Sequence, residues 1–243
     1  MMNSIKEKWK DIQDNFYSDP QKHTHLMYKP NSVYAKDLVN HLIYSIDIST
    51  DRTVLEIGAG AGRFSLHLLP HCRKLVALDS SISLLKILEN NHMPNLEIIC
   101  ADVFDIPEIL YLKNIDMVCG FFILHHLPKH ENLFSILHKM LKPAGSIAFI
   151  EPNRINPLFL LQVMVSPEMS WKAEKGMFTF SISKTKNILE QAGFVNIKLK
   201  YFGLFPPAIL DNFRFLYKFQ TFLEHINYLN RLLPFVLITA QKE

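Results

Sequence analysis

The stretch Val54-Leu55-Glu56-Ile57-Gly58-Ala59-Gly60-Ala61-Gly62-Arg63-Phe64 decides how the rest of the chain is interpreted. It begins as an apolar run typical of a buried strand and continues with three glycines at alternate positions. Glycine permits a turn that a Cβ atom would obstruct, and it lets a ligand approach the backbone closely. The helix expected next offers N–H groups without intrahelical partners. The stretch therefore predicts a strand, a ligand-binding turn and a helix.

The glycine spacing differs from the dinucleotide-binding fingerprint of the dehydrogenases. That fingerprint has its third glycine three residues after the second, and here this position is Arg63. The acid two places before the first glycine, Glu56, would add negative charge beside a pyrophosphate, whereas it would attract a cationic ligand group. An NAD(P)-dependent oxidoreductase of Rossmann type is therefore the alternative interpretation and not the first.

Outward from this stretch, short β-rich runs alternate with runs of helical periodicity. Strands are expected at 53–57, 74–78, 96–100, 115–119, 146–150, 197–201 and 235–240, and helices at 63–69, 82–88, 133–141 and 184–192. This alternation predicts an α/β fold with a parallel sheet covered by helices. Ligands of such sheets bind beyond the carboxyl ends of the strands, so we expect the functional site at that edge.

Further motifs follow the glycines along the chain. Asp79 closes the second expected strand, Cys100-Ala101-Asp102-Val103 closes the third, and Lys142-Pro143-Ala144-Gly145-Ser146 turns into the fifth. Together with the acid-x-Gly-x-Gly-x-Gly pattern they resemble, in order, the motifs of the class I S-adenosylmethionine-dependent methyltransferases over about residues 50–200. The resemblance implies a doubly wound, Rossmann-like, seven-stranded and mostly parallel sheet, with S-adenosylmethionine as the methyl donor.

The resemblance also implies roles for individual residues. The glycine turn would lie against the methionine part of the cofactor, the acid after the second strand would hold both ribose hydroxyls, and the acid after the third would accept a hydrogen bond from the adenine amino group. Residues at the end of the fourth strand would touch the methionine part and face the acceptor. The cofactor-binding residues implied in this way are Glu56, Gly58, Ala59, Gly60, Gly62, Asp79, Ser80, Asp102, Val103, Gly120 and Phe121.

Three residues are candidates for a catalytic base that removes a proton from the acceptor. His125 and His126 follow the fourth strand, and histidine titrates near neutrality. Adjacent residues do not share a helix face, so at most one of the two lines the site. Glu151 follows the fifth strand at the edge where ligands bind. Neither histidine has the i, i+4 partner of a helical metal site, so no metal is predicted.

Charge and composition narrow the class of partner. The chain has 26 basic and 23 acidic residues, a net charge of +3, and no run of like charge, which argues against nucleic acid as a partner. No window reaches the roughly 18 uninterrupted apolar residues of a membrane span, so only peripheral membrane contact stays open. The charged N-terminus lacks the apolar segment of a signal peptide, and we expect a cytoplasmic protein. The three cysteines have no CxxC spacing and are expected to be buried, reduced thiols.

The whole chain, 1–243, is interpreted as one methyltransferase domain. We expect a helical N-terminal cap at 1–40, a cofactor-binding core at 41–203, a helical insertion or lid at 204–233, and the last strand at 234–243. Within the insertion, Phe213, Phe219 and Phe222 form an aromatic stripe. Packing into the core is the first interpretation of such a stripe, and a lid over the acceptor or a membrane contact are the alternatives.

The methyl group is expected to pass to an O, N or C atom of the acceptor. The acceptor is expected to be small and apolar, because apolar residues dominate 157–169 and 204–223. Enzymes that methylate amino groups of nucleobases or glutamine usually carry an Asn/Asp-Pro-Pro-aromatic tetrad after the fourth strand. Gly120-Phe121-Phe122-Ile123 stands there instead, which argues against those acceptors. A non-catalytic subunit that binds S-adenosylmethionine is a second alternative.

Overall fold

The computed structural model describes residues 32–46, 48–105, 114–127, 130–156, 176, 179–205, 210, 212–213, 215–224 and 232–243. Most of the expected N-terminal cap, residues 1–31, and the apolar segment 157–169 lie outside the described residues. The division of the chain at residues 40, 203 and 233 therefore stays a prediction.

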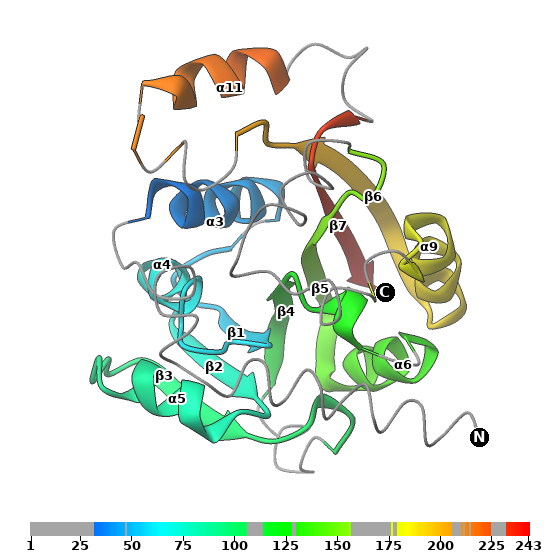
Figure 1. Ribbon diagram of the computed structural model, residues 1–243. Helices are drawn as coiled ribbons and strands as arrows, with labels where there is room; N and C mark the ends of the chain where they lie inside the picture. Colours follow the sequence, from blue (N-terminus) through cyan, green and yellow to red (C-terminus); the bar gives the residue numbers. More distant parts are fainter. Residues whose placement is uncertain are drawn as a thin grey trace, which may run out of the picture.

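The described strands form one mixed seven-stranded sheet in the order β3-β2-β1-β4-β5-β7-β6 (Figure 1). Their bounds are β1 Thr53–Ile57, β2 Lys74–Asp79, β3 Leu96–Cys100, β4 Ile115–Phe121, β5 Leu141–Pro152, β6 Phe194–Phe202 and β7 Phe235–Lys242. All neighbouring strands are parallel except β7, which runs antiparallel to both β5 and β6. The sheet confirms the predicted doubly wound, Rossmann-like fold class.

Helices cover both faces of this sheet (Figure 1). The helices α3 (Val33–Ser45) and α4 (Ser65–Leu68) pack on one face, and the end of α5 (Ile82–Glu89) packs there against β2. The helices α6 (His130–Met140) and α9 (Ile182–Gln191) cover the other face. Residues of β1 and β4 contribute alternately to the two hydrophobic clusters, because successive side chains of a strand point to opposite faces.

Serine residues begin several of the helices. Ser32, Ser81 and Ser181 each precede a helix in extended conformation, and each side chain accepts a hydrogen bond from a backbone N–H of the first turn. Such a cap satisfies one of the N–H groups that a helix start leaves without a partner. At the other end of α9, Gly193 takes a φ of +90°, the left-handed conformation that glycine commonly adopts just after a helix.

Three local expectations were wrong. The helix expected at 63–69 is the short α4, and a 3-10 turn, Leu69–His71, follows it because Pro70 lacks an N–H group to continue an α-helix. The turn expected before the fifth strand lies inside β5, where Ala144 has a φ of +59° and the pairing with β4 shifts register. Cys100 is exposed because it ends the edge strand β3, whereas Cys72 and Cys119 are buried.

The carboxyl ends of β1 to β5 share one edge of the sheet, and β6 ends there too because it runs parallel to β5. Phe202 at the end of β6 pairs with Phe235 at the start of β7. The connection between them carries α11 (Leu216–Glu224), which lies next to α3 (Figure 1) and bonds to the backbone of Gly203, Leu204 and Phe205 just past β6. Among the described residues, no helix is long and apolar enough to cross a membrane.

Candidate active site

The glycine turn after β1 is held in a conformation that only glycine adopts readily. Gly58 and Gly62 have φ values of +73° and +87°, in the left-handed region. A Cβ atom on Gly62 would lie 2.4 Å from Cδ1 of Leu88 in α5, and one on Gly58 would lie 2.7 Å from Cδ1 of Ile123 after β4. Glycine is therefore required both by the turn and by the elements packed against it.

Asp79, at the end of β2, is tied directly to this turn. Its Oδ2 accepts a hydrogen bond from the Gly60 N–H at 2.8 Å, and its Oδ1 accepts one from the Ser81 N–H at 2.8 Å. The two amides fix the orientation of a half-buried carboxylate at the lip of the turn. A carboxylate has about four acceptor sites, which suits simultaneous contact with the turn and with a vicinal diol.

Asp102 lies next to Asp79, because β2 and β3 are neighbours and end together. The Ala101 N–H donates to the Asp79 carbonyl oxygen at 3.0 Å, and Asp102 Oδ1 accepts from the Phe104 N–H at 3.0 Å. Asp102 is half-buried, and Val103 is buried beside it in a 3-10 turn. The structure thus brings together the glycine turn, Asp79 and Asp102, while Ser80 is exposed between the two strand ends.

Glu56 is placed differently from these two acids. Its side chain is fully buried between β1 and α4, where Oε2 accepts a hydrogen bond from the Ser65 hydroxyl at 2.5 Å. Burial raises the pKa of Glu56 to about 8; the Ser65 hydrogen bond opposes the rise, and the Asp79 charge adds to it. Glu56 therefore lies in the interior of the protein, where it is bonded to the first residue of α4.

Two of the candidate bases, Glu151 and His125, are bonded to each other in the interior. Glu151 Oε1 accepts from the backbone N–H groups of Ile123 and Leu124 at 2.9 and 2.7 Å, and Oε2 lies 2.6 Å from His125 Nδ1. The exposed fractions of the Glu151 and His125 side chains are 0% and 1%. His126 is half-buried, and its ring centroid lies 4.0 Å from that of His125. Of the three candidates, His126 has the greatest exposure.

Aromatic side chains surround the turn after β4. Phe121 stacks on Phe64 with ring centroids 4.2 Å apart, and Gly120 is buried just before it. Phe122 is half-buried, lies 5.5 Å from the Phe235 ring, and has a φ of +55°. A bulky residue in the left-handed region is a conformational outlier, and such strain concentrates at functional sites. The sequence does not single out Phe122, because no residue pattern reveals a positive φ at an aromatic position.

A hollow of about 520 Å³ lies at the opposite, amino-terminal edge of the sheet. Arg52, Asp116, Ser146 and Lys198 contribute to its lining. Ligands of doubly wound sheets bind at the carboxyl edge, so we assign the hollow no part in cofactor binding. The described residues contain no cluster of His, Cys, Asp or Glu that could hold a metal ion.

The residues at the carboxyl edge fit S-adenosylmethionine chemically. A turn with positive φ at Gly58, Gly60 and Gly62 lets a ligand approach the backbone, and two half-buried acids close the next two strands. Carboxylates suit a ribose diol and an adenine amino group, both of which donate hydrogen bonds. A family described as a methyltransferase domain matches residues 31–199, which include all of these positions.

Comparison with individual known proteins agrees with this family match. The phosphoethanolamine N-methyltransferase of Triticum aestivum is 34% identical over 104 residues, which are 41% of this chain and 21% of that protein. The chain thus matches about a fifth of the length of this curated relative. A solved phosphoethanolamine N-methyltransferase 2 of Haemonchus contortus, in complex with S-adenosyl-L-methionine, superposes with a TM-score of 0.57 at 14% identity, covering 90% of this chain and 59% of that one.

A further solved structure shares nearly the whole fold. A possible histamine N-methyltransferase of Thermotoga maritima superposes with a TM-score of 0.63 at 15% identity, over 95% of this chain and 99% of that one. These likenesses show the fold, and the match over 31–199 shows the family. The nicotinamide-dependent alternative is thereby set aside. The chain belongs to the family of S-adenosylmethionine-dependent methyltransferase domains.

Proposed function

We propose that this enzyme methylates a small, apolar acceptor at the carboxyl edge of its sheet. The observation that carries the proposal is the half-buried ring of Phe122 at the turn after β4, which packs against the buried rings of Phe64 and Phe235. Aromatic rings favour an apolar partner, because its transfer from water to such a surface is favourable. The phosphoethanolamine enzymes named above agree with a small acceptor, whereas the rings favour a less polar one than their names indicate.

Different residues at this edge bind different parts of the cofactor. The glycine turn receives the methionine part of the cofactor, Asp79 accepts from the ribose hydroxyls, and Asp102 accepts from the adenine amino group. S-adenosylmethionine supplies a methyl group activated by its positively charged sulfur. Holding the acceptor atom in line with that methyl group is the protein's largest contribution, since orientation of two reactants is worth about 7–11 kcal/mol.

We assign the removal of the acceptor's proton, where one must leave, to His126. Its partly exposed imidazole follows β4 at the edge where the acceptor binds. His125 and Glu151 are instead assigned to positioning, since they are buried and bonded to each other and to the backbone of this turn. A base adds roughly a hundredfold to such a reaction, so His126→Gln is expected to lower kcat and leave cofactor affinity unchanged.

Calorimetric titration with S-adenosylmethionine tests the cofactor assignment. We expect Asp79→Ala to bind the cofactor about 100-fold more weakly, because two hydrogen bonds to a charged group are lost. Asp51→Ala is the matched control, since Asp51 is an exposed acid before β1, at the other edge of the sheet. Undiminished affinity in Asp79→Ala, with the control also unchanged, contradicts the assignment of the ribose to Asp79.

Incubation with labelled S-adenosylmethionine and a cell extract tests the acceptor class. We expect the label in a small molecule that partitions into an organic solvent and is identified by mass analysis. Label recovered in RNA or in protein would overturn the acceptor proposal while leaving the methyltransferase assignment intact.

A further inference from the structure

The helix α11 buries polar side chains and exposes aromatic ones. Gln220 is buried and the Glu224 side chain is only 7% exposed, although both are polar. On the opposite side of the same helix, Phe219 and Phe222 are 51% and 67% exposed. A surface helix normally turns its apolar face toward the core and its polar face toward water. Among the described side chains of α11, only Leu216 at the start of the helix packs on the core in this way, whereas Gln220 and Glu224 are buried and the two phenyl groups are exposed.

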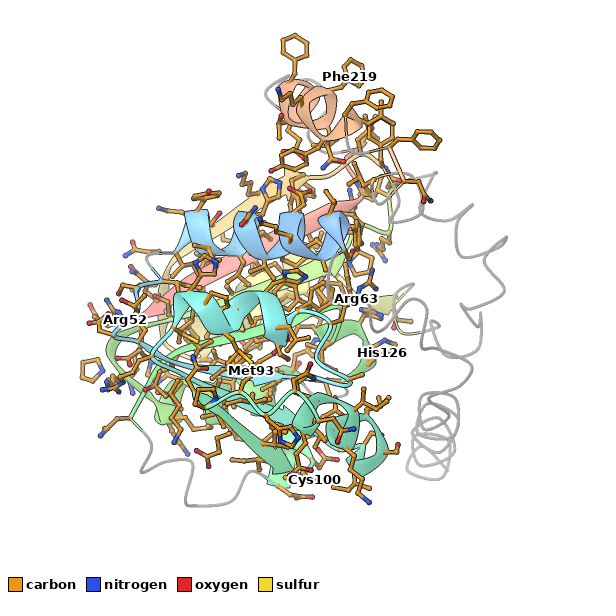
Figure 2. All side chains as sticks on the ribbon, turned by 90° about the vertical axis from the view of Figure 1, so that its left-hand side faces the viewer. Arg52, Arg63, Met93, Cys100, His126 and Phe219 are labelled. Atoms are coloured by element: carbon orange, nitrogen blue, oxygen red, sulfur yellow. The ribbon has the colours of Figure 1, made fainter. Side chains whose placement is uncertain are left out.

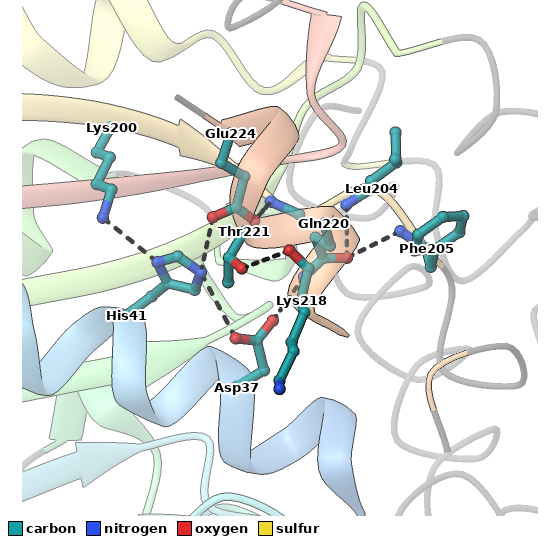
Figure 3. Close-up of polar contacts among 10 residues, drawn as sticks. Asp37, His41, Lys200, Leu204, Phe205, Lys218, Gln220, Thr221 and Glu224 are labelled. Carbon is teal, nitrogen blue, oxygen red and sulfur yellow. Dashed lines mark hydrogen bonds and ion pairs between the residues drawn. The ribbon is translucent and has the colours of Figure 1, made fainter. Parts of the chain in front are cut away.

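Specific hydrogen bonds fix this orientation (Figure 3). Gln220 Oε1 accepts from the backbone N–H groups of Leu204 and Phe205 at 2.9 and 3.1 Å, and its Nε2 donates to Asp37 of α3 at 2.8 Å. These partners come from α3 and from the segment that follows β6 (Figure 3). Turning Gln220 outward would leave buried donors and an acid without this partner, which is costly.

A second contact, one turn along α11, acts in the same direction. Glu224 Oε1 accepts from the Gly203 N–H at 2.8 Å, and Oε2 lies 3.4 Å from His41 Nε2 of α3. The Lys200 ammonium group lies 3.4 Å from the other nitrogen of His41 (Figure 3). The positions i and i+4 of Gln220 and Glu224 are thus both held inward, so the helix cannot rotate its aromatic side into the protein without breaking both sets of contacts.

This orientation leaves an exposed aromatic face on the outside of the molecule. We define the aromatic face by four residues: Phe213, Phe215, Phe219 and Phe222. The first two are 53% and 71% exposed, and their ring centroids are 6.3 Å apart. Phe219 stands at the end of the molecule farthest from Cys100 (Figure 2). Taking about 200 Å² for each side chain, the four rings expose about 500 Å² of apolar surface, which is within the range of functional patches.

The area and charge of the aromatic face indicate whether a second copy of the chain or a lipid layer binds there. A second copy of the chain would need about 800 Å² from each partner for a standard interface. The four rings of the aromatic face expose less than this, about 500 Å². The exposed charged side chain on α11 is Lys218. The acid of the helix, Glu224, is turned inward. Exposed phenyl groups beside a lysine match the interface of an anionic lipid layer.

We infer that the aromatic face of α11 docks this enzyme on an anionic lipid surface. The phenyl groups insert at the boundary between headgroups and acyl chains, and Lys218 lies among the phosphates. Because α11 bonds to the backbone of Gly203, Leu204 and Phe205, just past the carboxyl end of β6, docking holds this end of the carboxyl edge near the lipid. An apolar acceptor dissolved in that layer then reaches the enzyme without crossing water.

Co-sedimentation with vesicles tests the docking. One vesicle preparation is pure phosphatidylcholine, and the other contains phosphatidylcholine and phosphatidylglycerol in equal parts. We expect the wild-type protein to bind the anionic vesicles at least about tenfold more tightly. The variant carrying Phe219→Ser and Phe222→Ser should lose about tenfold for each phenyl group, and Lys218→Glu should lose about tenfold on the anionic vesicles alone.

Two controls accompany these variants. Tyr44→Ser removes another exposed aromatic side chain, on α3 and outside the aromatic face, and should bind as the wild type does. The melting temperature and the S-adenosylmethionine affinity of each variant should stay unchanged, which separates docking from folding and from the proposed function.

Several outcomes would overturn the inference. One is a wild-type protein that binds neither kind of vesicle, and another is a double serine variant that binds as well as the wild type. A third is a concentration-dependent dimer that the two serines abolish while no vesicle binds, since the occupant would then be a second copy of the chain.

Discussion

The ends of β1 and β5 lie at the same edge of the sheet, and each carries a buried glutamate, yet the two environments differ. Glu56 on β1 is bonded to one hydroxyl, that of Ser65, and burial raises its pKa to about 8. Glu151 on β5 accepts from two close backbone N–H groups and lies 2.6 Å from the imidazole of His125.

The difference teaches that burial alone does not define what a carboxyl group does. A carboxylate surrounded by backbone donors holds a loop in place, because each donor would otherwise be buried without a partner. A carboxyl group with one neutral donor is disfavoured in its charged form and takes up a proton instead. Replacing Glu151 should therefore lower the stability of the protein, whereas replacing Glu56 should raise it.

Replacing Glu151 is expected to have the largest effect. Glu151→Ala leaves the N–H groups of Ile123 and Leu124, and the His125 imidazole, buried and without an acceptor. At about 1–3 kcal/mol for each such group, and more for the imidazole, the free energy of unfolding should fall by about 6 kcal/mol. Urea denaturation followed by circular dichroism measures the loss.

Glu151→Gln is the matched variant, because its amide oxygen still accepts from the backbone while its charge is gone. It should cost clearly less than the alanine variant. A Glu151→Ala protein as stable as the wild type would show that the turn after β4 does not depend on this side chain.

The next largest effect is a gain of stability at Glu56. The folded pKa of about 8 lies above the unfolded value of 4.5, so the folded protein binds a proton that the unfolded chain releases. The associated stability is fully present below about pH 4.5 and is lost as the pH rises to about 8. Glu56→Gln stays neutral, so at pH 9 it should be about 5 kcal/mol more stable than the wild type.

At pH 5 the same two proteins should differ little, because Glu56 is then protonated in the folded state. The free energy of unfolding of both proteins, measured between pH 5 and pH 9, tests this prediction. Groups that titrate in both proteins cancel when one curve is subtracted from the other. A constant difference over this range would contradict the raised pKa.

Much of the cofactor half of the fold is predictable from the sequence because its signals are local. Alternate glycines specify a turn, and Asp79 and Asp102 each end an apolar run, so neighbouring parallel strands bring them to one edge. The structure has both acids there, with Asp79 bonded to the Gly60 N–H. Their contacts with the cofactor stay a prediction.

What the sequence does not reveal depends on contacts between distant segments. Glu151 and His125 each resemble a catalytic base until their 2.6 Å contact is known. The aromatic stripe of α11 was expected to pack into the core, and this was wrong. The periodicity identifies an apolar face but not its direction, which Gln220 fixes through Asp37, 183 positions earlier in the chain.

The smallest expected effect concerns Ser65, the hydrogen-bond donor to Glu56. Ser65→Ala should lower the free energy of unfolding by about 1 kcal/mol at pH 5, the value of one ordinary hydrogen bond. Because the Ser65 hydrogen bond lowers the pKa of Glu56, its removal should raise that pKa further. The loss of stability with rising pH then extends to higher pH than in the wild type, so the cost of Ser65→Ala should grow between pH 5 and pH 9.

A double-mutant cycle shows whether this growth belongs to the pair. In the Glu56→Gln background no charge develops, so the cost of Ser65→Ala should be the same at every pH. Ser135→Ala is the control, since that exposed hydroxyl bonds only within its own helix, to the Glu131 carbonyl oxygen, and should give a flat and smaller difference. If the cost of Ser65→Ala grew equally in both backgrounds, another titrating group would be responsible, and the contrast between the two glutamates would rest on Glu151 alone.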